Sequence, residues 1–398
     1  MGNAVVLGRT KSMVSVFAGV AAMNTAMVGA TTAGALIVAQ RNGPSWSGLP
    51  ATASVLGTAA GALGAGVLMA RRGGRFTLST AYGLAVAGGI IAFAGAVLSV
   101  LVVLLAGIVL LGIGNAGAQL SRYVAADLYP EQRRGFAVST IVWGGTVGAL
   151  AGPALIAPAS GLAVRLGLPS LSGPVAVSAL TAIVAMAAIL TLPREIPRTP
   201  EARPAPMSFP IRAALRRPVV LRPLVAMIAA QLAMVAVMTM TPLQLQAHGH
   251  GLGVVGWVLS AHMIGMFALA PLSGRIADRW GGQVAINCGL GTLAVAAATA
   301  VGAPTAHTSG LPLALFLLGY GWNLVFVGGS SLLSRDLPVE ERARLQGMVD
   351  ALVWGASALA SLAAGLLFAD GGYVLVAVVG GVLALLPFTL LTTRRERI

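Results

Sequence analysis

Residues 66–75 read GVLMARRGGR, and residues 274–283 read GRIADRWGGQ. The two stretches share an order of glycines, apolar residues and arginines at an offset of 208, from position 66 to position 274. Similar offsets recur outside them: LLGIGN at 110–115 returns as LLGYGW at 317–322, and Trp143-Gly144 returns as Trp354-Gly355. The chain is therefore predicted to consist of two copies of one structural unit.

Long apolar segments follow one another along both copies. A hydrocarbon core of about 30 Å needs about 20 apolar residues in a helix, and each segment reaches that length. Backbone groups inside lipid must be hydrogen-bonded within their own segment, so helices are expected. The fold class predicted is an all-α integral membrane protein with twelve transmembrane helices in two pseudo-symmetric halves. The twelve predicted spans are 13–39, 48–70, 77–98, 100–121, 136–160, 170–193, 219–244, 252–272, 283–303, 311–333, 346–368 and 371–393.

The composition agrees with a lipid-facing surface. Hydrophobic residues make up 57% of the chain and charged residues only 9%, whereas a soluble domain is nearer about 25% charged. The single cysteine, Cys288, excludes an internal disulfide.

Charge is unevenly distributed among the loops between these spans. If the N-terminus is cytoplasmic, all 25 Lys and Arg residues except Arg41 and Arg165 lie in cytoplasmic segments. Basic residues concentrate in the cytoplasmic loops of membrane proteins. The sequence thus predicts both termini in the cytoplasm, and it accounts for the net charge of +14 without a nucleic-acid partner.

The repeat and the charge pattern together predict the domain organisation. Residues 1–193 form an N-terminal six-helix half, residues 194–222 an Arg- and Pro-rich cytoplasmic linker, and residues 223–398 a C-terminal six-helix half. Two like halves that rock about a central site are a common architecture for alternating access.

The repeated loops resemble those of the major facilitator superfamily, a family of secondary transporters, and the resemblance extends over nearly the whole chain. The second loop looks like the signature loop of that superfamily, with Asp278 and Arg279 at its acidic and basic positions. The first copy has Ala70 where the acid belongs. The loop residues that carry the resemblance, and for which it implies a gating role, are Gly66, Arg71, Gly73, Arg75, Gly274, Asp278, Arg279 and Gly281.

A second motif lies in the fifth span and narrows the resemblance. Gly148, Gly152 and Pro153 resemble the Gly-x-x-x-Gly-Pro centre of a motif of drug–proton antiporters, and the nearest pattern is that of bacterial drug and metabolite efflux permeases. The outer glycines of that motif are absent, and Ile108 stands where those antiporters carry an intramembrane arginine. Gly-Pro is equally compatible with a packing kink.

The resemblance implies that spans 1, 4, 7 and 10 line a central cavity, and polar residues cluster on these spans independently of it. Amides that face lipid are unfavourable, so they are expected to point inward. Hydrogen bonding between helices is the alternative for any one of them. The candidate residues of the substrate cavity are Asn24, Thr31, Asn115, Gln119, Gln231, Met238, Trp322 and Asn323.

Two ionisable residues within the spans are candidates for proton coupling. His262 lies near the middle of the eighth span, and histidine changes its charge close to neutral pH. A neutral histidine bonded to a neighbouring helix is the alternative. Asp350, about one turn inside the eleventh span, is interpreted as a proton carrier, a helix-start charge, or a cytoplasmic latch that pairs with Arg71 or Arg75.

These observations predict a secondary active transporter that moves a small organic compound across the cytoplasmic membrane by proton-coupled efflux. Its partners are the solute, protons and the bilayer, and it is expected to work as a monomer. An uptake symporter, an uncoupled facilitator and a non-transporting membrane sensor are the alternatives. The sequence contains no metal-ligand cluster, no P-loop and no pair of intramembrane carboxylates, so neither a metal nor a cofactor nor an enzymatic activity is expected.

Overall fold

The computed structural model of the chain describes residues 2–129, 134–193, 215–304, 306, 309–336 and 339–392. Within these ranges the regular structure is helical throughout, as the sequence predicts. The chain divides into two compact units, one made of Met1–Arg41 and Leu49–Glu201 and the other of Asn42–Gly48 and Ala202–Ile398. The predicted boundaries at 193 and 223 stay a prediction.

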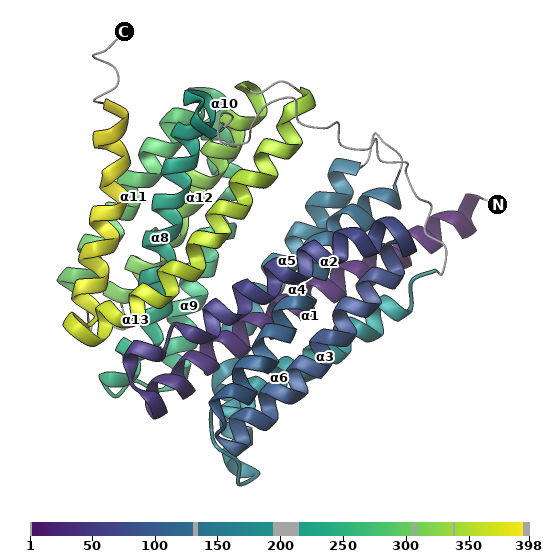
Figure 1. Cartoon of the computed structure of the whole chain (residues 1–398), viewed down its shortest axis with the longest axis horizontal. Helices are drawn as coiled ribbons and strands as arrows, with labels where there is room; N and C mark the ends of the chain where they lie inside the picture. Colours follow the sequence, from purple (N-terminus) through teal and green to yellow (C-terminus); the bar gives the residue numbers. More distant parts are fainter. Residues whose placement is uncertain are drawn as a thin grey trace. The chain divides into compact units, whose positions relative to one another are not determined.

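The first unit is a bundle of long helices in which α4 packs against both α2 and α3, and α6 packs against α3 and α5 (Figure 1). Small residues let these backbones approach closely, as is usual between helices in membranes. Its helices are α1 (Gly2–Asn42), α2 (Leu49–Arg72), α3 (Gly74–Leu98), α4 (Leu101–Asp127), α5 (Arg134–Arg165) and α6 (Ser172–Leu190).

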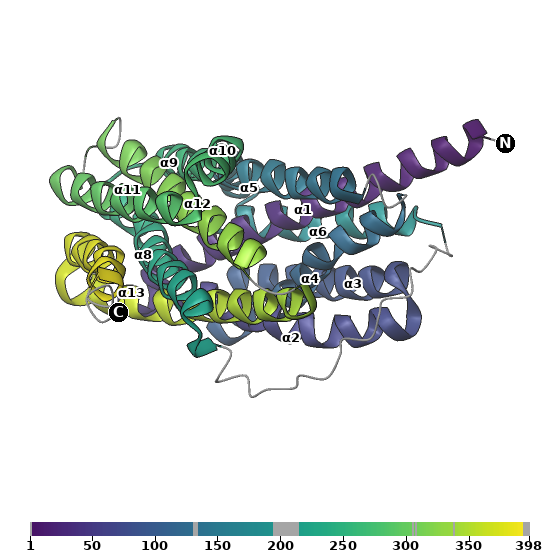
Figure 2. The ribbon, with the colours of Figure 1, turned by 90° about the horizontal axis from the view of Figure 1, so that it is seen from above.

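The second unit repeats the same kinds of contact, with α13 against α8, α12 against both α9 and α11, and α11 against α13 (Figures 1 and 2). The tight α11–α12 pair corresponds in the repeat to the α3–α4 pair. Its helices are α8 (Pro218–Ala247), α9 (Leu252–Phe267), α10 (Ala270–Trp280), α11 (Gly282–Gly302), α12 (Gly310–Asp336) and α13 (Val339–Thr392).

Ten of the described helical segments are long and apolar enough to cross a membrane. The helix α2 is not among them, and α13 counts once although it contains two predicted spans. Inside α13 the backbone leaves the helical conformation at Gly371 and at Gly372, whose φ is 65°. The predicted boundary between the last two spans therefore lies next to a sharp bend rather than in a loop.

The eighth predicted span is also interrupted. It is formed by α9 and α10, which are separated by Ala268 and Leu269. Pro271 is among the first residues of α10, where the absence of a proline N–H is tolerated. Leu63 is the equivalent residue in the first unit at the offset of 208, and α2 runs through it without interruption.

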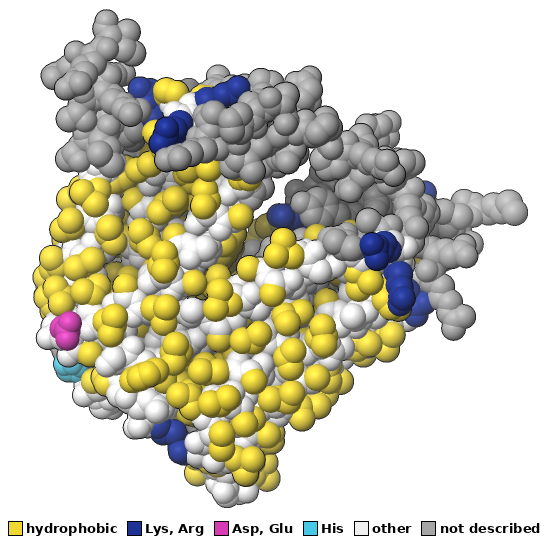
Figure 3. All heavy atoms as spheres, viewed as in Figure 1, with side chains coloured by type: hydrophobic (Ala, Val, Ile, Leu, Met, Phe, Trp, Pro, Cys, Tyr) yellow, Lys and Arg dark blue, Asp and Glu magenta, His cyan; other side chains and the backbone are white. Residues whose placement is uncertain are grey.

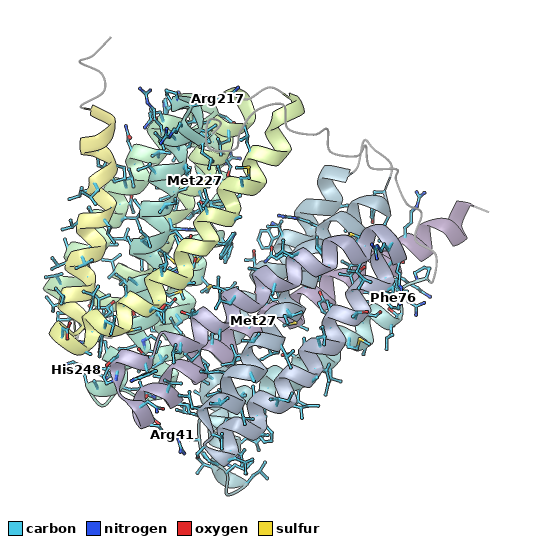
Figure 4. The ribbon with its side chains drawn as sticks, in the orientation of Figure 1. Met27, Arg41, Phe76, Arg217, Met227 and His248 are labelled. Carbon is cyan, nitrogen blue, oxygen red and sulfur yellow. The ribbon has the colours of Figure 1, made fainter. Side chains whose placement is uncertain are left out.

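Apolar side chains cover the flanks of the helices in each unit, and Lys and Arg side chains lie near helix ends on the face shown in Figure 3. In the first unit Arg71 and Arg72 end α2, while Arg41 ends α1. In the second unit Arg217 and His248 flank α8 at its opposite ends, with Met227 between them (Figure 4). Each unit therefore has an apolar band between polar or charged ends, as is expected of a membrane-spanning bundle.

The connection between α1 and α2 belongs to the second unit. This segment, Asn42–Gly48, includes the 3-10 turn η1 (Pro44–Trp46) and packs against α13. The Oγ of Ser47 is buried 3.5 Å from the sulfur of Met240, and a Cβ on Gly48 would overlap the backbone of Ser361. The segment is thus held by close contact between backbones.

Candidate functional site

A chain of hydrogen bonds joins α8, α12 and α13 inside the second unit. The indole Nε1 of Trp322 donates to the Oε1 of Gln231 at 2.6 Å, and the Nε2 of Gln231 donates to the Oγ of Ser357 at 2.6 Å. The Trp322 ring stacks on that of Phe326 with centroids 5.0 Å apart. Because an indole only donates, the orientation of the Gln231 amide is fixed. The predicted residues Gln231 and Trp322 are brought together, and Gln231 holds the Trp322 ring in place.

A second set of polar contacts lies between α9 and α12. The Nδ1 of His262 is 2.9 Å from the carbonyl oxygen of Leu315, and the Nδ2 of Asn323 donates to the carbonyl of Met266 at 2.8 Å. Both side chains are buried, His262 completely. Gly319 allows this approach, since a Cβ there would overlap the backbone of His262.

The polar atoms of this set that have no hydrogen-bond partner among the described residues are both acceptors. The Leu315 carbonyl can only accept, so the hydrogen of the neutral imidazole is on Nδ1 and the Nε2 of His262 is a bare acceptor. Neither His262 Nε2 nor Asn323 Oδ1 has a hydrogen-bond partner among the described residues. A buried polar atom without a partner is rare and unfavourable in folded proteins.

The first unit holds one comparable amide, on α4. The Nδ2 of Asn115 lies 3.5 Å from the Oγ1 of Thr58 on α2, and Asn115 Oδ1 is buried with no partner in the part of the chain that the structure describes. Gln119, one turn further along α4, is exposed, as is Arg122. The structure therefore sets Asn115 apart from the other two members of the predicted stripe.

The predicted cavity residues on α1 are bonded within their own helix. The Nδ2 of Asn24 donates to the carbonyl of Val20 at 3.0 Å, and the hydroxyl of Thr31 donates to that of Met27 at 2.8 Å. In the second unit Met238 on α8 is half-buried.

The glycines of the fifth span form the contact between α5 and α1. A Cβ on Gly148 would overlap the carbonyl of Ala21, and one on Gly152 would lie 2.8 Å from the Cβ of Val28. The hydroxyl of Thr25 also lies 3.2 Å from the Gly148 carbonyl. Gly144, four residues earlier, meets α1 in the same way at Phe17, and Pro153 is buried beside Gly152. This motif is a helix-packing surface in the first unit.

The signature loops share one backbone feature. Gly73 and Gly281 precede α3 and α11 with φ of 83° and 90°, a conformation that side chains disfavour. Gly274 is different, because a Cβ there would meet open space. Gly66 lies within α2, and its surroundings fall outside the described side chains. The loop glycines that the fold requires are thus the repeat-related pair Gly73 and Gly281.

The charged loop residues are exposed except for Arg75, which is half-buried and hydrogen-bonded. The guanidinium of Arg75 donates to the carbonyl of Leu190 at the end of α6, at 2.9 Å. Arg71, Asp278 and Arg279 are exposed, and Arg279 lies 5.4 Å from the ring centre of Trp280. Asp350 falls in α13, but its side chain is outside the described set, so its predicted roles stay predictions.

Sequence reasoning missed three residues that complete these contacts. Thr58 anchors Asn115, Ser357 anchors Gln231, and Gly144 extends the α1–α5 surface. Isolated hydroxyls in long apolar helices were the available signal for the first two. Among the described residues there is no group of three His, Cys, Asp or Glu placed to hold a metal ion.

Comparisons with known proteins give one consistent result. The family model described as Major Facilitator Superfamily matches residues 14–335 and 245–397. The chain is 31% identical over 378 residues to the uncharacterised MFS-type transporter YdeG of Bacillus subtilis, covering 92% of this chain and 87% of that protein. It is 28% identical over 338 residues to the riboflavin transporter RfnT of Brucella anthropi, covering 83% and 82%.

Solved structures share the fold at low identity. A D-xylose-proton symporter is similar with a TM-score of 0.68 at 18% identity, covering 95% of this chain and 96% of that one. An auto-inhibited peptide transporter of the POT family gives 0.73 at 14% identity and covers 97% of both chains.

Proposed function

Because the chain belongs to the Major Facilitator Superfamily, we propose that it exports a small uncharged organic compound across the cytoplasmic membrane in exchange for protons. Membership of this family shows that the protein is a multi-pass membrane transporter of a small solute and not an enzyme. The charge of the solute, the coupling to protons and the direction are our proposal.

The case for an uncharged solute comes from the polar groups within each unit. The side chains that bind or hold polar atoms there are amides, hydroxyls, an indole and a neutral imidazole. The acidic side chains that the structure describes are exposed, Asp278 near the end of α10 and Asp370 beside the bend inside α13. A charged solute in a low-dielectric interior needs an opposite charge close by.

The proposal of proton coupling rests on the environment of His262. Its ring is completely buried within the membrane span, and its Nε2 has no partner among the described residues. An ionisable group inside a membrane span is rare and generally functional. A ring that already donates through Nδ1 can take up a second proton only at Nε2, so this atom is the proposed proton site.

Support for export comes from the fifth span. The Gly148–Gly152–Pro153 pattern resembles that of drug–proton antiporters, and the structure uses it to pack α5 closely on α1. The positive-inside pattern of the sequence supports the cytoplasmic membrane as the location, with both termini in the cytoplasm. We expect the protein to act as a monomer.

Riboflavin is the first probe, because a relative that aligns with most of the chain is named a riboflavin transporter. The test uses inside-out membrane vesicles, in which an exporter carries solute inward. A vesicle interior more acidic than the medium should drive accumulation of riboflavin, or of another compound in a panel of growth inhibitors. A protonophore should abolish that accumulation.

Comparison of inside-out with right-side-out vesicles separates the alternatives. Accumulation only in right-side-out vesicles with an acidic medium would show uptake by symport, and flux without any response to the pH gradient would show a facilitator. Absence of flux for every compound with the purified, reconstituted protein would contradict transport and leave the sensor.

A further inference from the structure

The amide of Asn323 has a fixed orientation. It faces the carbonyl oxygen of Met266 at 2.8 Å, and a carbonyl can only accept a hydrogen bond, so the NH2 group must point at it. The Oδ1 atom is therefore directed away from this contact. Asn323 is 6% exposed, and its Oδ1 finds no partner in the described ranges.

The same reasoning assigns the orientation of the Asn115 amide, although its contact with Thr58 is longer. The hydroxyl of Thr58 donates its hydrogen to the carbonyl of Ser54 at 2.9 Å, so towards Asn115 the Thr58 oxygen can only accept. The group that faces Thr58 at 3.5 Å must then be the NH2 of Asn115. Here too the Oδ1 atom is buried, and no described residue bonds to it.

Gln231 provides a comparison, because both ends of its amide are hydrogen-bonded within the protein. Its oxygen accepts from Trp322 and its nitrogen donates to Ser357, so both ends are bonded. Asn115 and Asn323 differ from it in the same respect: their donors are bonded inside their own unit and their acceptors are not. The two positions lie on the repeat-related helices α4 and α12, where the motif offset of 207 from LLGIGN to LLGYGW places Asn323 one residue beyond the equivalent of Asn115.

We propose that the Oδ1 atom of Asn115 in the first unit and that of Asn323 in the second can each accept a hydrogen bond from an N–H or O–H group of a transported compound. This inference rests on the proposed function and deepens it, because it names the solute class. The class is uncharged compounds with at least one such donor, such as amides, lactams, imides and alcohols. Ethers, tertiary amides and fully N-methylated heterocycles fall outside it, because they offer these oxygens no hydrogen.

The expected selectivity depends on buried acceptors to which no described residue of the protein donates a hydrogen bond. Leaving a buried acceptor unbonded destabilises the protein, and a hydrogen-bond donor from the solute removes that penalty. A site built to bond a donor rejects an analogue that lacks it more strongly than a site rejects a missing methyl group. The donor therefore contributes selectivity as well as affinity.

The experiment compares binding of matched pairs that differ by one donor to the purified full-length protein. The probes are lumiflavin and its imide-N-methyl derivative, theophylline and caffeine, and acetanilide and N-methylacetanilide. For the pairs that bind, the dissociation constant of the methylated member should exceed that of its parent by about three- to tenfold. Because each probe has a single N–H, which can bond only one of the two oxygens, at least one of Asn115→Ala and Asn323→Ala should bring this ratio close to one.

A control variant separates recognition from stability. Asn287→Ala removes an exposed amide of α11 that bonds only to Gln283 at 3.1 Å among the contacts described, and it should keep the wild-type ratio. If either alanine variant is unstable, Asn→Leu at the same position fills the volume without supplying an acceptor. A merely structural role would weaken both members of a pair equally and leave the ratio unchanged.

The outcomes are distinct from those of the transport assay. Equal binding of parent and methylated compounds to the wild type, an unchanged ratio in both asparagine variants, or no binding by any pair would overturn the inference. Donor-dependent binding without proton-driven flux would support donor recognition while contradicting the proposed export.

Discussion

A completely buried histidine whose Nδ1 is bonded can play two roles, and one substitution separates them. If Nε2 carries the coupled proton, His262→Ala should abolish the response of transport to an acidic vesicle interior. Exchange of labelled for unlabelled solute at equal pH should continue, because it requires no net proton movement. His248→Ala, at the exposed end of α8, is the matched control.

A purely structural His262 would give another pattern. The Leu315 carbonyl would lose its partner from α9, the protein would be less stable, and exchange and proton-driven flux would fall together. Proton-driven flux at the wild-type rate in His262→Ala would remove this residue from the coupling mechanism.

Gln231 is the residue on which the polar chain of the second unit depends. Gln231→Leu keeps a similar volume but leaves the Trp322 indole without an acceptor and Ser357 without its donor. A buried group left unbonded costs about 1–3 kcal/mol. The variant should therefore unfold at a lower temperature in detergent, whereas Gln283→Leu, at an exposed position of α11, should not. Equal unfolding temperatures for the wild type and the two variants would refute a stabilising role of these hydrogen bonds.

At the scale of elements, the α1–α5 contact makes a sharp prediction. Gly148→Val places a side chain where the carbonyl of Ala21 already lies, so α5 cannot stay close to α1. Overpacking of this kind typically costs about 1–3 kcal/mol or more. Transport and folded yield should both fall, while Gly161→Val, in the same helix but facing open space, should be tolerated. Wild-type transport by Gly148→Val would show that this contact is not needed.

The helices themselves could largely be read from the sequence, but their interruptions and rotations could not. Long apolar runs require helices in lipid, which is why the predicted all-α fold agrees with the structure, in which ten of the described helical segments are long and apolar enough to cross a membrane. The bend at Gly372 and the break before Pro271 depend on local backbone geometry and on packing.

The site was only partly predictable for a related reason. Amides in apolar spans stand out, so Asn115, Gln231 and Asn323 could be selected from the sequence. Their partners could not, because helices that are apolar on every side give no periodic signal for the face each turns to its neighbour. Thr58 and Ser357 became meaningful only once the rotation of α2 and α13 was known.

For the whole molecule, the orientation in the membrane is the property to test first. In a Cys288→Ser background, Arg41→Cys should react with a membrane-impermeant maleimide added to intact cells, and Arg71→Cys should react only after the cells are opened. The reason is that Arg41 ends α1 and Arg71 lies in the last turn of α2, at opposite ends of the first unit. The reverse labelling pattern would place both termini outside.

The packing of Asn42–Gly48 within the second unit has a consequence for how the protein can be divided. The chain passes from one unit to the other after Arg41, after Gly48 and after Glu201. If the chain is cut after Glu201, the first fragment still contains the segment Asn42–Gly48, which belongs to the second unit. Residues 1–201 then contain a peptide that completes the fold of residues 202–398. Co-expressed as separate polypeptides, the two fragments should co-purify and complement each other. Replacing Gly48 by valine, which would overlap the backbone of Ser361, should separate them.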